Sequence, residues 1–405
     1  MRPIPALVTD VVGVVRSLGD VGIPSIVASE YPRSPTFRSR HCIRDVRLPN
    51  LGEEPERAVE ILLKIGMAFP GRPPILTGRE SDVAMVSRGR ERLAPLFRIQ
   101  MAPIPLMEAV NDKTGFMDLS VRFDLPVPRS WSPEVIREVT FPCLLKPPAQ
   151  GYWAREKIYS IVGRWRKGLL IGNRDDLNRA VERLAAADAP DFIVQEFIPG
   201  GDDQLFDFHA YFPAPGKVAG FFLGRKIRTS PRTFGQGSYT RSWIAPEISK
   251  VAIEILERLN YIGPANLNLK RDPRTGRIHL LEINPRFSIW CHLASRSGVN
   301  LPLAMYNDCL GLPLPKLEQS PLERRWLYFY FDWRTLPEYR RAGEWNRWTW
   351  FRSLLFPRVT FFRWDWADPL PLLGSLWQFL AVRVELRLRR ILGYFFKSRG
   401  ESSVR

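Results

Sequence analysis

A carboxylate and an amide close one apolar segment of the chain. Residues 280–286 read Leu-Leu-Glu-Ile-Asn-Pro-Arg. Alternate side chains of a strand share one face, so Glu282 and Asn284 should lie together. Pro285 is expected to end the strand. Two neighbouring hard oxygen donors suit Mg²⁺, and Arg286 beside them suits a phosphate or a carboxylate. A strand with a solvated outer face would explain the same residues, so other segments must decide.

The segment that precedes this strand carries polar residues with the same spacing. Residues 264–272 alternate as a strand, and a Pro-Arg-Thr-Gly turn separates them from the opening strand. The two strands are therefore expected to form a hairpin that brings Asn268 and Lys270 beside Glu282 and Asn284.

Two further segments place polar side chains at strand ends. Lys146 closes the apolar strand at 141–148, where it is either solvated or a phosphate ligand. Gln195 and Glu196 lie at a strand-to-loop hinge before a Gly-rich turn. Such a hinge is either a surface turn or a place where backbone groups face an adenine.

Composition limits the classes of function. The chain has 405 residues and a net charge of +17, which indicates anionic partners such as nucleotides, nucleic acid or a membrane surface. Its four cysteines and four histidines show no zinc-site spacing, and the cysteine usage favours a reducing cytoplasm. No apolar stretch is long enough to span a membrane, and no signal sequence is expected. No G-x-G-x-x-G or G-x-S-x-G motif occurs, which disfavours a dinucleotide site and a serine nucleophile.

The order of the expected elements divides the chain into three domains. Residues 1–108 alternate short strands and helices, which indicates a small parallel α/β layer. Residues 109–315 mix helices, a meander and the hairpin, and they include a polar loop at 228–242 that is too long for an ordinary connection. Residues 316–405 carry 8 of the 13 tryptophans and many arginines.

Taken in order, the segments of the second domain resemble the ATP-grasp superfamily, and specifically its predicted carboxylate–amine ligases. The resemblance covers about residues 1–315. It rests on the following stretches: "NDKTGF", "LPVPRSW", "FPCLLKP", "VQEFIPGGDDQLFDFHAY", "GQGS", "GPANLNLKRD" and "LLEINPRFS". It implies an α/β and α+β protein with an ATP-grasp fold after a small parallel α/β domain, followed here by a helical, aromatic and basic extension.

The resemblance also implies roles for individual residues, with ATP and Mg²⁺ as cofactors. It implies that Lys113, Lys146 and Lys270 contact ATP and that Asp203 lies near the ribose. It implies an adenine-facing hinge made of Gln195, Glu196, Phe197 and Ile198. It further implies that Glu282, Asn284 and Asn268 hold the metal, and that Arg286, with Lys146, acts on the acyl phosphate or the substrate carboxylate.

The chemistry implied by the resemblance is ligation of a small-molecule carboxylate to an amine. A carboxylate attacks the γ-phosphate of ATP, so two anions must meet, and a metal with lysines offsets their repulsion. The amine then displaces phosphate from the acyl phosphate. The loop at 228–242 is expected to be a lid that excludes water, and its residues Arg228, Arg232 and Arg241 are expected to bind an anionic substrate.

One residue departs from the family pattern. Asn268 stands where the family usually has an acidic residue, and an amide coordinates Mg²⁺ without adding charge. A catalytically weak or inactive ATP-grasp nucleotide-binding protein is therefore the alternative function.

The last ninety residues lie outside the resemblance. The stretch 374–399 repeats apolar residues at helical spacing with arginines elsewhere, which predicts a basic amphipathic helix. Such a helix suits an anionic membrane surface on the inner face of the membrane. The alternatives are packing on the protein itself or on a second subunit, as in a homo-oligomer, while the lack of an RNA-binding motif disfavours nucleic acid.

Overall fold

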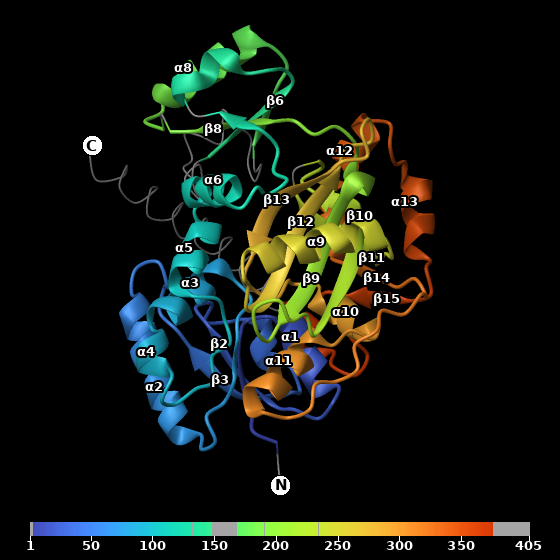
Figure 1. Ribbon diagram of the computed structural model, residues 1–405. Helices are drawn as coiled ribbons and strands as arrows, with labels where there is room; N and C mark the ends of the chain where they lie inside the picture. The colour runs from blue at the N-terminus through green and yellow to red at the C-terminus, as the bar shows by residue number, and fades with distance from the viewer. Residues whose placement is uncertain (1–2, 132, 148–167, 190, 234, 376–405) are drawn as a thin grey trace, which may run out of the picture.

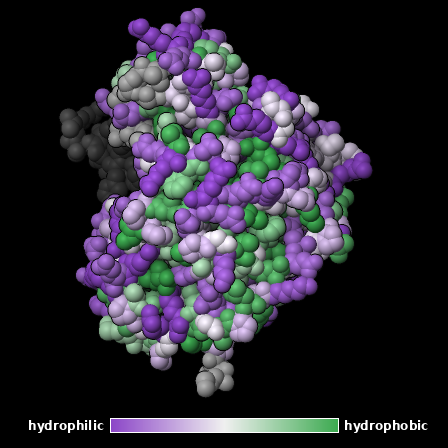
Figure 2. Space-filling view, in the orientation of Figure 1, coloured by the Kyte–Doolittle hydropathy of each residue, from purple (hydrophilic) through white to green (hydrophobic). Residues whose placement is uncertain are grey.

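The computed structural model describes residues 3–131, 133–147, 168–189, 191–233 and 235–375 (Figure 1). Three sheets organise these residues, with four, seven and four strands. In Figure 1 the first sheet lies at the bottom, the seven-stranded sheet in the middle and the third sheet at the top. Hydrophilic and hydrophobic residues are interspersed over the face of the molecule that Figure 2 shows.

The N-terminal residues form the expected parallel sheet with helices around it. Its strand order is β3-β2-β1-β4, and every neighbouring pair is parallel. The strands are β1 (Ala6–Thr9), β2 (Ser25–Ser29), β3 (Cys42–Arg47) and β4 (Ile75–Leu76). The helices are α1 (Val12–Gly19), α2 (Pro55–Ala68), α3 (Glu80–Arg88) and α4 (Arg90–Leu93). The edge strand β3 escaped prediction because most of its side chains are exposed and polar, so it lacks an apolar run.

A small antiparallel sheet forms a separate layer above the others. Its order is β5-β8-β6-β7, and the helix α8 packs on it around a core that contains Leu145, Leu177 and Val194. The elements are β5 (Ser130–Trp131), β6 (Cys143–Lys146), β7 (Leu169–Ile171), α8 (Arg174–Ala185) and β8 (Ile193–Glu196). Two helices, α5 (Ile104–Asn111) and α6 (Lys113–Arg122), connect the N-terminal sheet to this layer.

The central sheet has the strand order β13-β12-β9-β10-β11-β14-β15. Its strands are β9 (Leu205–Phe212), β10 (Gly220–Ser230), β11 (Gln236–Ser242), β12 (Gly263–Arg271), β13 (Ile278–Asn284), β14 (Arg325–Leu327) and β15 (Val359–Phe361). The helix α9 (Pro246–Arg258) packs on one face, while α10 (Cys291–Arg296), α11 (Leu301–Leu310) and α1 pack against the other. All of β9 is buried because both faces are covered, which explains its nearly continuous aromatic and apolar sequence.

The expected hairpin between 264–272 and 278–284 is confirmed. Strands β12 and β13 are antiparallel neighbours, and Asn268 lies directly opposite Glu282. The same row continues across the sheet, because Asn268 also lies opposite Asp207 of β9. Directly opposed residues in a sheet point to the same face, so the three side chains share one side of the sheet.

The prediction of a long lid loop at 228–242 is wrong. Strand β10 runs to Ser230 and β11 begins at Gln236, so only a short turn separates them. The polar sequence suggested a loop. These strands nevertheless form, because their polar side chains pair with polar side chains of other segments.

The three arginines for which substrate binding was expected all form ion pairs. The Arg228 guanidinium is fully buried in an ion pair with Asp332, at 2.8 Å. Arg232 pairs with Glu344, and Arg241 pairs with Glu323 at 3.4 Å. Each guanidinium thus has a carboxylate partner from the C-terminal extension, and the full burial of Arg228 corrects its expected role in anion binding.

The described part of the C-terminal extension packs on the rest of the molecule. β14 pairs with β11, and β15 pairs with β14. Two helices, α12 (Phe329–Arg341) and α13 (Arg347–Leu354), follow β14. A buried ion pair between Asp368 and Arg16, at 3.1 Å, ties the extension to α1. The predicted amphipathic helix at 374–399 lies outside the described residues except for its first two positions, and the boundaries of the three domains stay predictions.

No helix within the described residues is long and apolar enough to cross a membrane.

Candidate functional site

A cavity of about 510 Å³ lies between the small sheet and the edge of the central sheet. Strands β6 and β8 line one side, β12 and β13 line another, and α5 and α6 contribute a third wall. Nine of the residues singled out in the sequence line it: Lys146, Gln195, Glu196, Phe197, Ile198, Asn268, Lys270, Glu282 and Asn284. The tertiary structure thus brings together residues that are up to 138 positions apart, as the difference between 146 and 284 shows.

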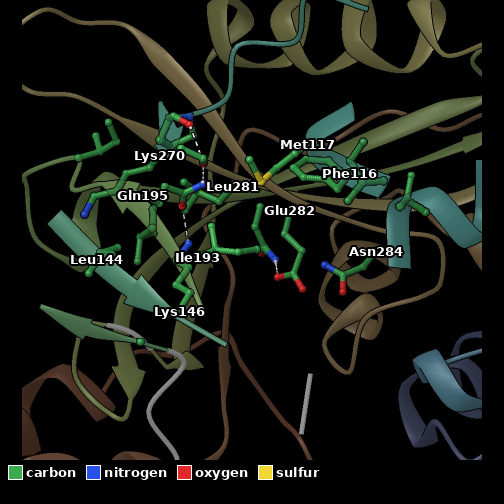
Figure 3. A pocket seen from close by; sticks show the side chains of 18 of the residues that line it. Phe116, Met117, Leu144, Lys146, Ile193, Gln195, Lys270, Leu281, Glu282 and Asn284 are labelled. Atoms are coloured by element: carbon green, nitrogen blue, oxygen red, sulfur yellow. Dashed lines mark hydrogen bonds between the residues drawn. The ribbon is translucent and has the colours of Figure 1, made fainter. Parts of the chain in front are cut away.

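Strand β13 places the candidate metal ligands on the wall of this cavity. Glu282 and Asn284 both line the cavity, and Figure 3 shows their polar groups close to each other. Asn284 is buried, and its side-chain oxygen accepts a hydrogen bond from Arg286 at 3.1 Å. A carboxylate and an amide oxygen are donors that Mg²⁺ accepts, and phosphate oxygens and water commonly complete its shell. The donor set therefore fits one divalent ion.

Asn268 is placed as a partner of Glu282. Its side-chain amide donates a hydrogen bond to the Glu282 carboxylate at 3.0 Å, from the opposite strand. The amide nitrogen is therefore engaged with the carboxylate, and this contact fixes the direction in which Glu282 points. Within the described residues, no group of three or more Asp, Glu, His or Cys side chains is arranged to hold a metal.

In Figure 3, Lys146 and Gln195 lie to the left of Glu282, whereas Asn284 lies to its right. The Lys146 ammonium donates to the Gln195 side-chain oxygen, and the Gln195 amide donates to the Ser130 hydroxyl at 3.1 Å. These three residues come from the neighbouring strands β6, β8 and β5. The small sheet thus presents one ammonium group to the cavity and holds it by a chain of hydrogen bonds.

Lys270 lies beside the hinge that follows β8. Its ammonium group is 5.2 Å from the centre of the Phe197 ring, a distance at which a cation and an aromatic face attract. Burial lowers the pKa of Lys270. A buried ammonium group next to an aromatic ring is suited to an anionic ligand, which would replace the lost hydration.

Three of the predicted residues are not among those that line the cavity. Arg286 lies next to it and donates to Glu80 at 2.9 Å as well as to Asn284. Asp203 is largely exposed and forms an ion pair with Arg225 at 3.0 Å, so its ribose contact stays a prediction. Lys113 begins α6, and its side chain lies outside the part of the structure that is described.

Sequence reasoning missed an ion pair at the wall of the cavity. Lys226 of β10 lines the cavity, and its ammonium group is 3.3 Å from a carboxylate oxygen of Asp207. Both residues are buried. The signal was present, because Lys226 and Gly224 share a face under strand alternation and Gly224 lies opposite Asp207. This signal was not used because residues 228–242, which begin two positions after Lys226, were predicted to form a loop.

Apolar walls and a further acid were also missed. Phe116 and Met117 of α6, with Leu144 of β6, give the cavity apolar sides, as a planar base requires. Glu80, the first residue of α3, lines the cavity from the N-terminal domain and receives the hydrogen bond from Arg286. The cavity therefore reaches from the small sheet to the start of α3.

Comparisons with known proteins point to ATP-grasp proteins. A family model described as "ATP-grasp in the biosynthetic pathway with Ter operon" matches residues 221–327. A D-aspartate ligase from Enterococcus faecium (strain Aus0004) is 26% identical over 242 residues, which are 55% of this chain and 55% of the relative. The chain spans about half the length of the curated relatives that it matches.

Solved structures share the fold at low sequence identity. Biotin carboxylase from Campylobacter jejuni, in a β-γ-ATP complex, has a TM-score of 0.59 and 14% identity, covering 80% of this chain and 75% of that one. An L-amino acid ligase from Bacillus licheniformis has a TM-score of 0.57 and 17% identity, covering 76% of this chain and 75% of that one. The mixed α/β fold predicted from the sequence is confirmed.

Proposed function

We propose that this chain, which belongs to the ATP-grasp superfamily, is an ATP- and Mg²⁺-dependent ligase that joins a carboxylate to an amine through an acyl phosphate. The observation that carries the proposal is the cavity between the small sheet and β12–β13. There Lys146 faces the side of the cavity that holds Glu282 and Asn284. Cationic groups and hard oxygen donors converge on one space, which is what a bound nucleotide triphosphate requires.

The small sheet and its hinge would bind the nucleotide. The backbone of the hinge at Glu196, Phe197 and Ile198 is suited to the edge of the adenine, between apolar walls that include Met117 and Leu144. Lys146, held by Gln195, would contact the phosphates from one side. Lys270 would contact them from the other side, next to Phe197.

The strand β13 would hold the reacting end of the triphosphate. Glu282 and Asn284 would hold Mg²⁺, which when bound offsets phosphate charge and so lets a carboxylate approach the γ-phosphate. Asn268 would keep the Glu282 carboxylate in place through its hydrogen bond. Arg286, next to Asn284, would orient the substrate carboxylate or the acyl phosphate.

The reaction balances without a protein nucleophile. An oxygen of the carboxylate substrate forms a bond to the γ-phosphorus, and the bond to the β-phosphate oxygen breaks to release ADP. The amine nitrogen then attacks the carbonyl carbon of the acyl phosphate. Phosphate leaves with the bonding electron pair, the nitrogen loses a proton, and an amide remains. The contribution of the chain is to position the reactants and offset their charges.

Phosphate release from ATP tests the proposal. Purified protein with Mg²⁺ would be screened against a panel of carboxylic acids and amines, including amino acids and sugar acids. We expect release only when a matching acid and amine are both present. Glu282→Ala should abolish it, whereas Glu257→Ala, an exposed acid on α9, should leave it unchanged. Unchanged turnover in the Glu282 variant would reject the site assignment.

A catalytically weak nucleotide-binding protein is the second candidate, and the hydrogen bond from Asn268 to Glu282 favours it because the position adds no negative charge. Nucleotide titration by calorimetry, with and without Mg²⁺, separates the two. An equal nucleotide affinity with and without Mg²⁺, together with no phosphate release for any acid and amine of the panel, would support this second function. Metal-dependent binding with turnover would reject it.

A further inference from the structure

The outer faces of α12 and α13 expose an unusual number of large apolar side chains. Their exposed fractions run from 48% for Phe351 to 65% for Leu355. At about 100 Å² for each half-exposed aromatic side chain, the set reaches the size of the largest apolar patches on monomeric proteins. The six side chains, called the aromatic face below, are Phe329, Tyr330, Trp333, Trp348, Phe351 and Leu355.

Helix geometry groups these side chains on the side away from the protein. Trp348 and Phe351 of α13, with Leu355 directly after its last residue, are spaced three and four positions apart, so they lie along one side of the helix. In α12 the buried residues are Asp332, Thr335, Leu336 and Tyr339, and they pack on the β10–β11 hairpin and its surroundings.

Trp350 joins the two helices at the base of the aromatic face. Its ring centre lies 5.2 Å from that of Trp333 and 6.1 Å from that of Phe329. Trp350 is itself buried, and its indole nitrogen donates to Asp332 at 2.7 Å. The exposed rings therefore stand on a rigid support that is anchored to the sheet.

The charge around the aromatic face is positive. Five arginines of the two helices are exposed: Arg334, Arg340, Arg341, Arg347 and Arg352. The sequences of α12 and α13 contain two acids. Asp332 is buried against Arg228, and Glu338 accepts a hydrogen bond from the backbone of Arg232. The acids thus turn toward the hairpin and leave the arginines at the outer surface.

We propose that the aromatic face docks the protein on an anionic membrane surface. Aromatic side chains with apolar bodies insert into the interfacial region, and arginine side chains extend to the phosphate groups. Each basic residue near an anionic surface adds attraction that salt screens. The helices would lie in the plane of the interface.

A second copy of the chain fits this surface less well. A twofold contact places the same patch on both sides, so the arginines of one copy would face the arginines of the other. Nucleic acid also fits less well, because stacking needs open ring faces and Leu355 offers none. The predicted basic amphipathic sequence that follows residue 375 would strengthen the same attraction to lipid.

Vesicle flotation of the full-length protein tests the proposal. The vesicles would be phosphatidylcholine alone or phosphatidylcholine with about one third phosphatidylserine, at low and high salt. We expect binding to the anionic vesicles at low salt and a loss of binding at high salt. The triple variant Trp333→Ser, Trp348→Ser, Phe351→Ser should bind at least about tenfold more weakly. Met67→Ser, an equally exposed apolar residue on α2, is the matched control and should bind as the wild type.

A charge variant keeps the test valid if the triple variant fails to fold. Arg340→Glu with Arg341→Glu removes two exposed arginines without touching the rings, and it should also weaken binding. Lys250→Glu on α9 is its control. Wild type that stays with the soluble fraction at low salt would overturn the proposal. Variants of the aromatic face that bind lipid as the wild type does would also overturn it. The same holds if these variants change only the oligomeric mass, or lose only the binding to an oligonucleotide.

Discussion

The side-chain amide of Asn268 donates a hydrogen bond to the carboxylate of Glu282 at 3.0 Å, across the β12–β13 hairpin. The two residues are directly opposed in the register of the strands. A carboxylate at position 268 would replace the amide, which donates this hydrogen bond, with a second acceptor. Two carboxylates would then lie next to each other.

Asn268→Asp should make the fold depend on a divalent cation. Two opposed carboxylates repel, so without metal we expect the free energy of unfolding to fall by about 1–2 kcal/mol. Mg²⁺ should restore it, because the cation would bind between the two groups. Urea unfolding with EDTA and with Mg²⁺ measures the difference. Asn268→Ala loses the same hydrogen bond without adding charge and should show no such recovery; equal behaviour of both variants would place position 268 outside the metal site.

Lys226→Met should weaken nucleotide binding and also destabilise the protein. The Lys226 ammonium lies 3.3 Å from Asp207, and both residues are buried. Removal of the ammonium group takes away one favourable charge partner of the buried Asp207 carboxylate, and breaking a buried ion pair in this way typically costs about 3–5 kcal/mol.

The double variant Lys226→Met, Asp207→Asn separates the two effects. It should recover most of the lost stability, because the charge of Asp207 is removed together with that of Lys226, but not the affinity for ATP. We expect ATP affinity to stay at least about tenfold below that of the wild type, since a charge next to the phosphates is gone. Calorimetric titration and urea unfolding of the same samples check this. Recovery of full affinity in the double variant would show that Lys226 has only a structural role.

Asp332→Asn should strongly destabilise the protein, although Asp332 is not among the residues that line the cavity. Asp332 accepts hydrogen bonds from Arg228, Ser238 and Trp350, and the Arg228 side chain has no exposed surface. An unpaired buried guanidinium should lower the free energy of unfolding by about 3–5 kcal/mol. Glu318→Gln, which removes an exposed ion pair with Lys316, is the control and should change it by less than about 1 kcal/mol.

Removal of residues 316–405 should yield an insoluble protein. The deletion removes β14 and so leaves the edge of β11 unpaired. It also removes the carboxylate partner of the buried Arg228. Expression followed by separation of soluble and insoluble fractions is the measurement. A soluble, monomeric product that unfolds cooperatively would show that the extension is dispensable for the fold.

The protein should lose stability as the pH falls below 6.5. Burial lowers the pKa of His209 from 6.5 to about 3, with Lys226 and Arg286 contributing. The unfolded chain therefore binds a proton between about pH 6.5 and 3 that the folded chain excludes, so stability is fully present above 6.5 and declines as the pH falls through this window.

His209→Gln removes this titration, so its stability should fall less steeply between pH 7 and pH 5 than that of the wild type. Urea unfolding at several pH values measures both slopes. Because burial also lowers the pKa values of His41, His279 and His292, the variant should keep part of the slope. Equal slopes in both proteins would show that His209 titrates alike in both states.

Local patterns were sufficient to predict the elements and part of the site. Apolar periodicity and turn residues predicted the strand–helix alternation of the N-terminal sheet and the β12–β13 hairpin. A short turn fixes the register of two adjacent strands, so the sequence could place Asn268 beside Glu282. It also indicated Lys146 and the hinge at Gln195, since strand ends with polar residues are visible in one segment.

Only the tertiary structure decided which distant side chains neutralise one another. Arg228 and Asp332 are 104 positions apart, and a pattern that is read within one segment contains no information about such a partner. The sequence of the polar hairpin therefore predicted a loop, although its side chains form long-range ion pairs in the folded chain. For the same reason Lys226 with Asp207, and the place of the extension in the central sheet, appeared only in the folded chain. Periodicity and turn chemistry act between near neighbours in the chain, whereas burial of charge depends on which strands meet across the whole fold.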